Sequence, residues 1–217
     1  MSISQVQKSS LTDVYFTGTE EQWNEISIGS YNDDLLNATI HFLGEDEEPA
    51  LINGTWGSLT WTLNESTGEL VISGEGEMET FEDDLTSAWR EYKGLIKSVT
   101  IENSVTSIGV GAFYECINLT SIEIPNSVTT IGASAFYECE SLTSIVIPDG
   151  VTTIGLCAFF GCTSLTSVTF EDPYGWSVSV TDLGDVATNL TLTDAAQNAK
   201  FLNGDLSPSE MYIWSKQ

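Results

Sequence analysis

Basic side chains are the scarcest charged groups in this sequence: six lysines and arginines stand against 32 aspartates and glutamates. The formal net charge of the 217 residues is −26, and nineteen of the acidic residues precede residue 96. A nucleic acid or an anionic membrane surface would repel such a chain, because both carry negative charge. The composition therefore argues against these two partners without identifying another.

Long hydrophobic runs are also missing. No segment approaches the ~20 apolar residues that a membrane span requires. The first ten residues, MSISQVQKSS, lack the basic and apolar segments of a secretory signal peptide. Hydrophobic residues nevertheless make up 41% of the chain, which is enough for a folded core. We expect an ordered protein without a membrane span.

Side chains for catalysis are few. The only histidine, His41, lies in an expected strand with no cysteine nucleophile or serine motif nearby. Nucleophilic catalysis needs a base within hydrogen-bond reach of the nucleophile. No esterase, zinc-protease, P-loop or dinucleotide-binding motif is present. Among 32 acids some carboxylates will always fall close together, so a glycosidase pair cannot be recognised without geometry. The sequence predicts neither an enzyme nor a cofactor.

Three of the four cysteines, Cys116, Cys139 and Cys162, recur every 23 residues. This column predicts stacked, buried thiols that fill apolar space. Neighbouring strands lie ~4.8 Å apart, so the distance alone would allow a bridge between adjacent thiols. Cys157 breaks the column, and two cysteines without a neighbouring histidine make a poor zinc site. We expect reduced, packed thiols and no metal.

Residues 96–170 contain one phrase three times, at a constant step of 23 residues, and then half of a fourth copy. The copies are IKSVTIENSVTSIGVGAFYECIN, LTSIEIPNSVTTIGASAFYECES, LTSIVIPDGVTTIGLCAFFGCTS and LTSVTF. A fixed period in the twenties is typical of a solenoid, in which each coil leaves an apolar face that the next coil covers. We therefore predict a parallel solenoid over this range.

The apolar positions of each copy predict the course of the coil. In the second copy the inward residues of two successive strands are Leu119, Ile122 and Ile124, then Val128 and Ile131. Residues 135–139 should return the chain as a short helical or irregular turn. The phenylalanines of this turn, one in each copy, should form one buried stack: Phe113, Phe136 and Phe159. Corner glycines with positive φ are expected at Gly109, Gly132 and Gly155.

The repeated phrase, L-T-S-I-x-I-P-x-x-V-T-T-I-G-x-x-A-F-x-x-C, resembles the BspA-type leucine-rich repeat family. The resemblance implies a mainly β, right-handed leucine-rich-repeat solenoid of 23-residue coils. It also implies a surface protein of bacteria or protozoan parasites with an extracellular or cell-surface binding role, often called adhesion, and no catalytic chemistry. Because the termini do not show secretion, we interpret the chain as a mature or excised fragment.

The outward positions of the first strand form two columns, which are our candidate binding residues. One column holds small hydroxyls and the other is variable: Ser98, Ser121, Ser144 and Ser167, then Thr100, Glu123, Val146 and Thr169. Such a flat, wettable face is the kind of extended surface that solenoids use to bind partners. Serine and threonine also simply suit an exposed strand, and the sequence does not separate the two interpretations.

Residues 1–43 change pattern after Phe16. Thr19 and Gln22 have the spacing of a capping box, which predicts a short helix with Trp23 and Ile26 on one face. Residues 38–42 then alternate as a strand. We interpret residues 1–43 as the terminal coil of a preceding repeat module, cut off by the acidic linker 45–49. An ordinary helix–strand cap of the same domain is the alternative.

Residues 44–95 are expected to form the linker and a β-hairpin cap before the array. Residues 59–63 and 70–72 alternate across a loop, as in a hairpin. Trp89 and Tyr92 are the expected anchors beneath it. The acidic run Glu75–Asp84 is the best calcium candidate, because calcium takes several oxygen ligands, but its order matches no known loop and we expect a solvated face.

Residues 171–217 are expected to form an irregular C-terminal cap. Residues 176–180 alternate as a closing strand. Ser207, Pro208 and Glu210 stand in the order of a helix start, which predicts a short terminal helix or turn carrying Tyr212 and Trp214.

Two functions from different classes remain. The first is a non-catalytic surface module that binds a host protein, matrix component or glycan through the solenoid. The second is a structural spacer in a longer surface protein. The sequence decides neither the ligand nor the oligomeric state.

Overall fold

The chain forms two compact units, residues 1–49 and residues 50–217. A computed structural model describes residues 12–16, 19–29, 35, 37–42, 50–79, 87–180, 184–203 and 212–216.

The described residues of the first unit form a strand–helix–strand coil. Strand β1 (Asp13–Phe16) pairs in parallel with β2 (Thr39–Phe42), and helix α1 (Glu20–Asn24) lies between them in sequence. The predicted capping box is present, because the Thr19 side chain accepts from the Gln22 backbone and the Gln22 side chain accepts from the Thr19 backbone. The interpretation of residues 1–43 as the terminal coil of a preceding repeat module stays a prediction.

The second unit begins with an antiparallel meander of β3 (Leu51–Trp56), β4 (Leu59–Asn64) and β5 (Glu69–Gly74). The predicted hairpin is its second half, and β3 is an additional strand that we did not predict. The last meander strand pairs in parallel with β7 (Ser98–Ile101), so it lies directly against the first coil of the array.

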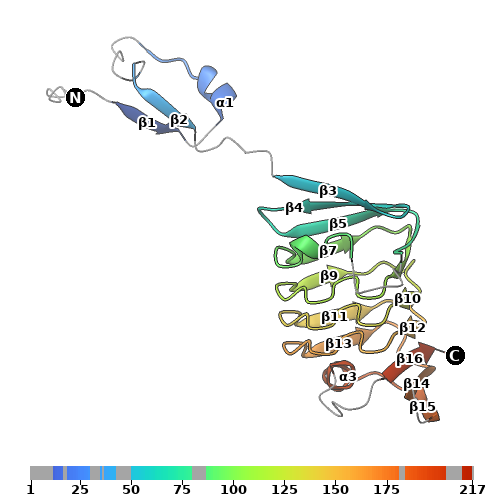
Figure 1. Cartoon of the computed structure of the whole chain (residues 1–217). Helices are drawn as coiled ribbons and strands as arrows, with labels where there is room; N and C mark the ends of the chain where they lie inside the picture. Colours follow the sequence, from blue (N-terminus) through green and yellow to red (C-terminus); the bar gives the residue numbers. More distant parts are fainter. Residues whose placement is uncertain are drawn as a thin grey trace. The chain divides into compact units, whose positions relative to one another are not determined.

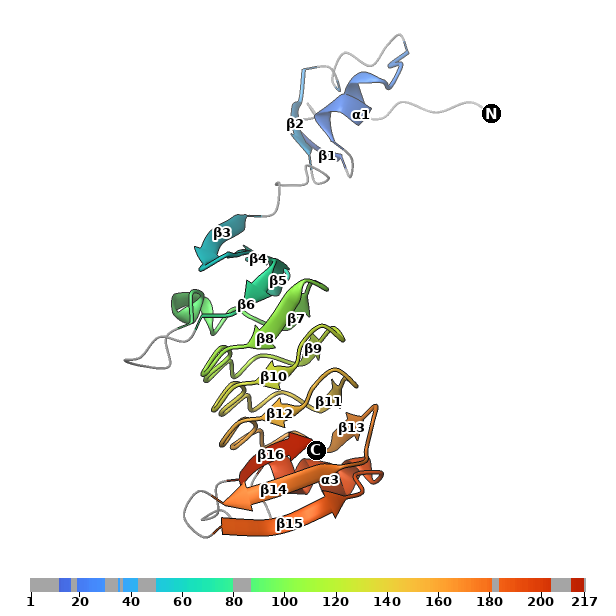
Figure 2. The ribbon, with the colours of Figure 1, turned by 90° about the vertical axis from the view of Figure 1, so that its right-hand side faces the viewer.

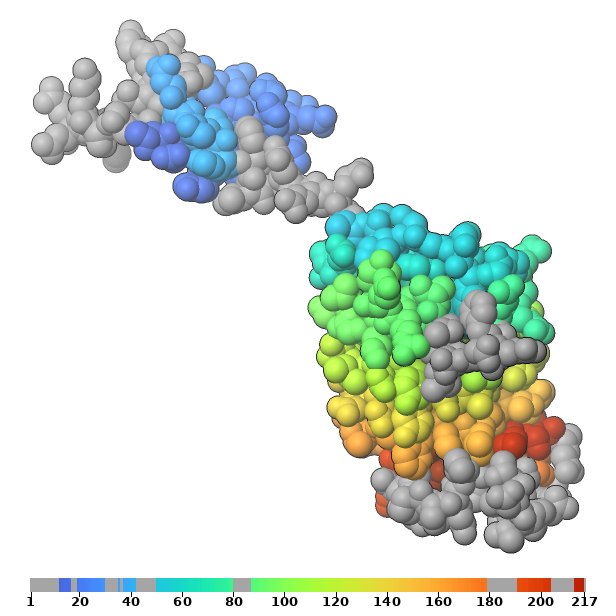
Figure 3. Space-filling model, viewed as in Figure 1, coloured from blue at the N-terminus to red at the C-terminus, as the bar shows by residue number. Residues whose placement is uncertain are grey.

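The array has two strands in most coils, and equivalent strands of successive coils pair in parallel, except that β9 and β11 lie in separate sheets (Figures 1 and 2). The first strands are β7, β9 (Ser121–Glu123), β11 (Ser144–Ile147) and β13 (Ser167–Phe170). The second strands are β8 (Val105–Ile108), β10 (Thr130–Ile131) and β12 (Thr153–Ile154), preceded by the short β6 (Gly76–Glu77). In the space-filling view the coils follow one another as bands from green to orange (Figure 3). The mainly β solenoid with 23-residue coils is confirmed, whereas its right hand stays a prediction.

The core of the array is an aromatic stack that runs through the turns. Phe113, Phe136 and Phe159 are fully buried, with ring centroids 5.3 and 5.0 Å apart in nearly parallel planes. Trp89 continues the stack at 5.4 Å from Phe113, just before the short helix η1 (Arg90–Tyr92), and its indole N–H donates to the Ala112 carbonyl at 2.8 Å. The predicted stack is therefore confirmed. It begins before the first phenylalanine, with Trp89.

The column thiols lie beside this stack and are buried and free, as predicted. The Sγ of Cys139 donates to the Phe113 carbonyl and that of Cys162 to the Phe136 carbonyl, at 3.2 and 3.1 Å. These two thiols thus tie their own coils to the preceding ones while they fill apolar space.

The expected positive φ at Gly109, Gly132 and Gly155 is wrong. A Cβ on Gly132 would lie 2.6 Å from the Val110 backbone nitrogen, so the glycine is needed for close approach of adjacent coils. The left-handed residues lie in two other columns of the turn: Gly111, Ser134 and Cys157, then Glu115, Glu138 and Gly161. Only glycine adopts this conformation without steric cost, and Cys157 takes the first column's position despite its side chain.

The C-terminal end of the array is closed by three strands and a helix. Strand β16 (Tyr212–Lys216) lies between β12 and β14 (Trp176–Val180), antiparallel to both, and β15 (Gly184–Leu190) pairs with β14. The closing strand at 176–180 is confirmed. The helical prediction for Tyr212 and Trp214 is wrong, because these residues form β16, and residues 207–210 lie outside the described residues.

Helix α3 (Ala195–Leu202), which we did not predict, packs on β13, the last of the first strands. Its N-cap is Asp194, whose side chain accepts from the backbone of Ala196 and Gln197. The buried amide of Asn198 donates to the carbonyls of Val168 and Leu192, both at 3.0 Å. The Val168 carbonyl of β13 thus receives a hydrogen bond from Asn198, because no further coil follows to donate one.

Candidate functional site: the outward sheet face

All eight candidate binding residues lie on the outward side of the first strands, and none is buried. The alternation within β11 shows the cause, because Ile145 and Ile147 are buried while Ser144 and Val146 are exposed. Val146 is 50% exposed, which is high for an apolar side chain in a strand. The structure therefore brings the two predicted columns together on one face.

The outward face continues beyond the array onto the meander. Across the sheet, one row of paired residues runs from the cap to the second coil: Asn53, Thr62, Val71, Thr100 and Glu123. The Thr62 hydroxyl donates to Asn53 Oδ1 at 2.7 Å, which orders the beginning of the row. Sequence reasoning missed this extension, since it had not found β3.

The hydrogen-bonded sheet on this side is interrupted between β9 and β11. Strands β3, β4, β5, β7 and β9 form one sheet, and β11 and β13 form another. Ile122 of β9 and Ile124, just after β9, are only partly buried, unlike Ile145 and Ile147 of β11. Glu123 and Val146, equivalent positions of successive coils, therefore flank a break in an otherwise regular face.

A shallow groove of about 580 Å³ lies at the end of β7 and β9. Its lining combines two carboxylates, three neutral polar side chains and apolar residues: Thr100, Ile101, Glu102, Asn103, Ser104, Glu123, Ile124 and Pro125. Two of the predicted binding residues, Thr100 and Glu123, belong to it. The groove adds a concave, acidic feature to a face that is otherwise flat.

A second array of side chains lies along the turns. Tyr114, Tyr137 and Phe160 stack with centroids 5.0 and 5.5 Å apart and are partly exposed. Lys93 donates to Glu115 at 2.5 Å, which lowers the pKa of that carboxyl. Partial burial raises the pKa of both tyrosines. Because the rings stack on each other, they present mainly edges to a ligand, and we regard this stripe as packing between coils.

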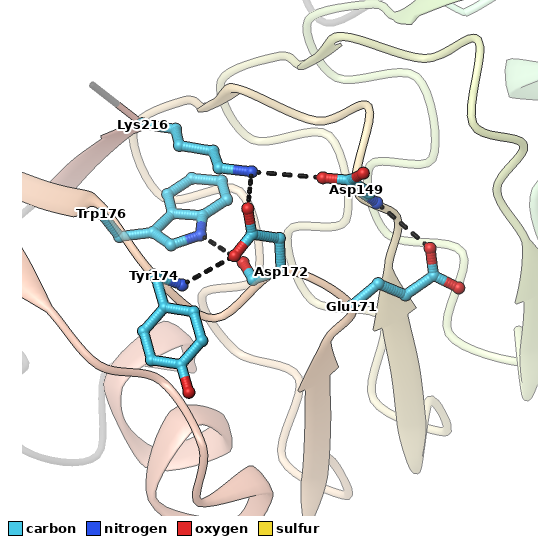
Figure 4. A network of polar contacts seen from close by, with 6 residues as sticks. All are labelled: Asp149, Glu171, Asp172, Tyr174, Trp176 and Lys216. Atoms are coloured by element: carbon cyan, nitrogen blue, oxygen red, sulfur yellow. Dashed lines mark hydrogen bonds and ion pairs between the residues drawn. The ribbon is translucent and has the colours of Figure 1, made fainter.

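A polar network fastens the C-terminal strand to the array (Figure 4). Lys216 contacts Asp172 at 2.6 Å and Asp149 at 3.3 Å, and its backbone N–H donates to the Thr152 carbonyl. The Asp149 N–H in turn donates to Glu171 at 3.2 Å. The ammonium group of Lys216 lowers the pKa of Asp172, and Asp172 raises that of Lys216. The four charged groups, Lys216, Asp149, Glu171 and Asp172, therefore stabilise the C-terminal cap.

The comparisons with known proteins identify the repeats. The family model described as BspA type leucine rich repeat region (6 copies) matches residues 88–185. These residues are a BspA-type leucine-rich repeat array. No similar sequence was found among curated proteins.

Solved structures similar to this BspA-type array are bacterial leucine-rich repeat proteins. One from Eubacterium ventriosum is 22% identical, with a TM-score of 0.41, over 58% of this chain and 46% of that protein. A leucine-rich repeat protein of T. pallidum is 24% identical, with a TM-score of 0.36, over 55% of this chain and 64% of that protein. A leucine-rich cell surface protein from Faecalibacterium prausnitzii is 20% identical, with a TM-score of 0.23, over 62% and 60%. The match thus spans about half to two thirds of the solved proteins.

The other groups that could carry chemistry are dispersed. His41 lies at the surface of the first unit, where its ring contacts Asp13 at 2.9 Å and stacks on Tyr15. The hydrogen bond with His41 lowers the pKa of Asp13. In the BspA-type array burial raises the pKa of Cys116 to about 12, and contact with Cys162 together with burial raises that of Cys139. These thiols therefore stay protonated and poorly nucleophilic near neutral pH.

Two further findings concern metals and membranes. Within the described ranges, no three His, Cys, Asp or Glu side chains gather as a metal-binding group. The acidic run at Glu75–Asp84 falls partly outside these ranges, so its prediction as a solvated face stays a prediction. No helix in the described part of the chain is long and apolar enough to cross a membrane.

Proposed function

We propose that this chain is a non-catalytic binding module that presents the outward face of its BspA-type array to a host protein, matrix component or glycan at a cell surface. The observation that carries the proposal is the face itself. Seven strands expose hydroxyl, amide and carboxylate side chains on one side, and the eight predicted residues all belong to it. Extended faces of this kind are where repeat solenoids bind their partners.

The break between β9 and β11, with the adjoining groove, is the proposed centre of recognition. Binding sites usually combine a concave apolar floor with a few polar groups that fix orientation. Here Ile124 and Pro125 provide apolar surface, and Glu123 provides a carboxylate at the rim. Val146 adds exposed apolar area in the next coil. A ligand lying across the strands would contact both Glu123 and Val146.

The proposed cell-surface location is supported by the repeat family, and the similar Faecalibacterium protein is a cell surface protein. The net charge of −26 favours partners that are neutral or basic on their contacting side. We therefore place basic proteins and uncharged glycans at the head of the ligand classes to be tested.

The test is a binding screen of the chain against host glycans and matrix proteins. Glu123→Gln and Val146→Ser are expected to weaken any reproducible interaction by about tenfold each, as for contacts near the centre of an interface. Matched controls remove the same groups elsewhere: Glu140→Gln takes away an exposed acid of the turn side, and Ile117→Ser takes away a side chain that is 45% exposed. The controls should bind normally.

Two results would contradict the proposal. Equal losses in the controls and in the face variants would show that the ligand does not bind at the outward face. Absence of binding to every member of the panel would favour the other function, a structural spacer in a longer surface protein.

A further inference from the structure

The two ends of the outward sheet differ in how they are closed. At the C-terminal end, helix α3 packs on β13 and Asn198 donates to a β13 carbonyl. At the other end, β3 pairs with β4, and no other described strand pairs with it. Proteins usually protect an exposed edge with a charge, a proline, a bulge or a covering element, because an open strand recruits further strands.

The hydrogen-bond phase of β3 defines which groups face the open edge. The Glu65 N–H donates to the Ala50 carbonyl at 3.0 Å, and residues 50 and 65 are opposite in the β3–β4 register. In an antiparallel pair, hydrogen-bonded positions alternate along each strand. Even-numbered residues of β3 therefore bond to β4. Leu51, Asn53 and Thr55 direct their backbone N–H and C=O groups toward the open edge.

Among the described residues, β3 itself carries none of the usual protection. Strand β3 has regular register along all six of its residues, without a bulge, and contains no proline, lysine or acid. Residues 50–64, which include β3 and β4, contain no charged side chain at all, in a chain with 32 acids and six bases. Leu51 is also 51% exposed. Within residues 50–64, a second copy of this strongly negative chain therefore meets no like charge.

We propose that the β3 edge is an interface at which two copies of this chain pair antiparallel across a two-fold axis. Among the registers that this phase allows, the one centred on Asn53 engages all three edge-facing residues: Asn53 lies opposite its own equivalent, and Leu51 lies opposite Thr55. A two-fold axis makes such a contact self-complementary, since each copy offers the same donors and acceptors in reverse order. The two five-stranded sheets then become one continuous sheet of ten strands. This interface is separate from the proposed ligand-binding centre at Glu123 and Val146.

Repulsion between negative charges outside the β3 edge should make dimerisation depend on the salt concentration. Each copy carries −26, and four acids at residues 45–48 immediately precede β3 in the sequence. Salt screens repulsion between exposed charges beyond ~8 Å at physiological ionic strength. Dimerisation should therefore tighten as salt is raised, opposite to the behaviour of a complex held by ion pairs.

The experiment is sedimentation of the full chain over a wide concentration range, from about 1 to about 500 μM. A reversible monomer–dimer equilibrium is expected, with a dissociation constant that falls when salt is added. Thr55→Glu should weaken the dimer by about tenfold, because the added charge enters the interface twice. Thr60→Glu is the matched control, since Thr60 lies directly opposite Thr55 on the same outward face but one strand away from the edge.

A second variant removes only one edge-facing group. Thr55→Pro deletes an N–H that does not bond to β4, so it should leave the melting temperature nearly unchanged while it weakens the dimer. Residue-resolved amide exchange provides the direct readout. The amides of Ile52 and Gly54 should be protected at every concentration, and those of Asn53 and Thr55 only when the dimer forms. A monomer at all concentrations, or equal weakening by Thr55→Glu and Thr60→Glu, would overturn the proposal.

Discussion

Truncation of Phe136 to alanine perturbs the centre of the array most directly. The ring is fully buried between Phe113 and Phe159, at 5.3 and 5.0 Å and in nearly parallel planes. Its backbone N–H donates to the Ala158 carbonyl at 2.7 Å, and its carbonyl accepts from Cys139 and Cys162. On the other side, the Phe113 N–H donates to the Ala135 carbonyl at 2.8 Å. Neighbouring coils on both sides are therefore fixed by hydrogen bonds and cannot collapse into the space that the ring leaves.

The expected cost follows from this rigidity. Removal of a buried phenylalanine costs ~3–5 kcal/mol, with the larger values where the cavity persists. Loss of two stacked aromatic neighbours places Phe136→Ala toward the upper end of that range, at about 4–5 kcal/mol. Tyr137→Ala is the matched control in the adjacent, partly exposed stripe, and it should cost about 1–2 kcal/mol because part of the ring already contacts water.

Urea unfolding of the second unit measures both values. With a slope of ~2 kcal/mol/M, the midpoint of Phe136→Ala should fall by about 2 M without a change in slope. A midpoint within about 0.5 M of the parent would refute the argument that the turn-side stack carries the core. A reduced slope would show instead that cooperative unfolding is lost.

Three further outcomes are expected. Asn198→Ala should cost about 2–4 kcal/mol in the same assay, because two buried carbonyls lose their donor, whereas Lys200→Ala on the exposed side of α3 should be nearly neutral. In thiol titration of the native protein only Cys157 should react, and all four cysteines should react in denaturant; a second reactive thiol in the native protein would contradict the packed column. The pKa of Asp172 is lower in the folded chain than in the unfolded one, so its contact with Lys216 stabilises fully above the unfolded value and is lost as pH falls through the folded value. Melting temperatures of Lys216→Met and the parent should therefore converge in acid and differ at neutral pH, and a constant difference would argue against this ion pair.

The array could be predicted from the sequence because its period leaves little freedom. Once Ile96, Leu119, Leu142 and Leu165 occupy equivalent positions, the strands, the buried phenylalanine stack and the outward columns follow from alternation and stacking. The same reasoning located the eight candidate site residues on one face. What those residues bind does not follow, since small hydroxyls on a strand are compatible with many partners and with none.

The elements outside the period were harder to predict, for identifiable reasons. In β3 the inward positions are Ile52, Gly54 and Trp56, and the glycine hides the alternation; the Trp61 ring occupies the space above it. Strand β16 pairs with segments about 35 and 60 residues away, so no local pattern marks its position between β12 and β14. By contrast, helix α3 has a visible signal, an aspartate N-cap before AAQNAKFL, that we overlooked.

The turn geometry shows a limit of a different kind. Positive φ is easily expected at glycine, but four of the left-handed residues are Glu115, Ser134, Glu138 and Cys157. Coil-to-coil hydrogen bonds impose this conformation, for example from the Ser134 N–H to the Leu156 carbonyl and from the Glu138 N–H to the Phe160 carbonyl. Such tertiary constraints override local preference and leave no trace in the residue type.

Amide hydrogen exchange of the chain, alone and saturated with a ligand selected from the glycan and matrix panel, tests the central claim most directly. The account predicts slowed exchange in β7, β9, β11 and β13 and in the corner at residues 102–104, with the strongest effect around Glu123 and Val146. Slowed exchange confined to the turn-side stripe of Tyr114, Tyr137 and Phe160 would contradict the assignment of the outward face as the binding surface.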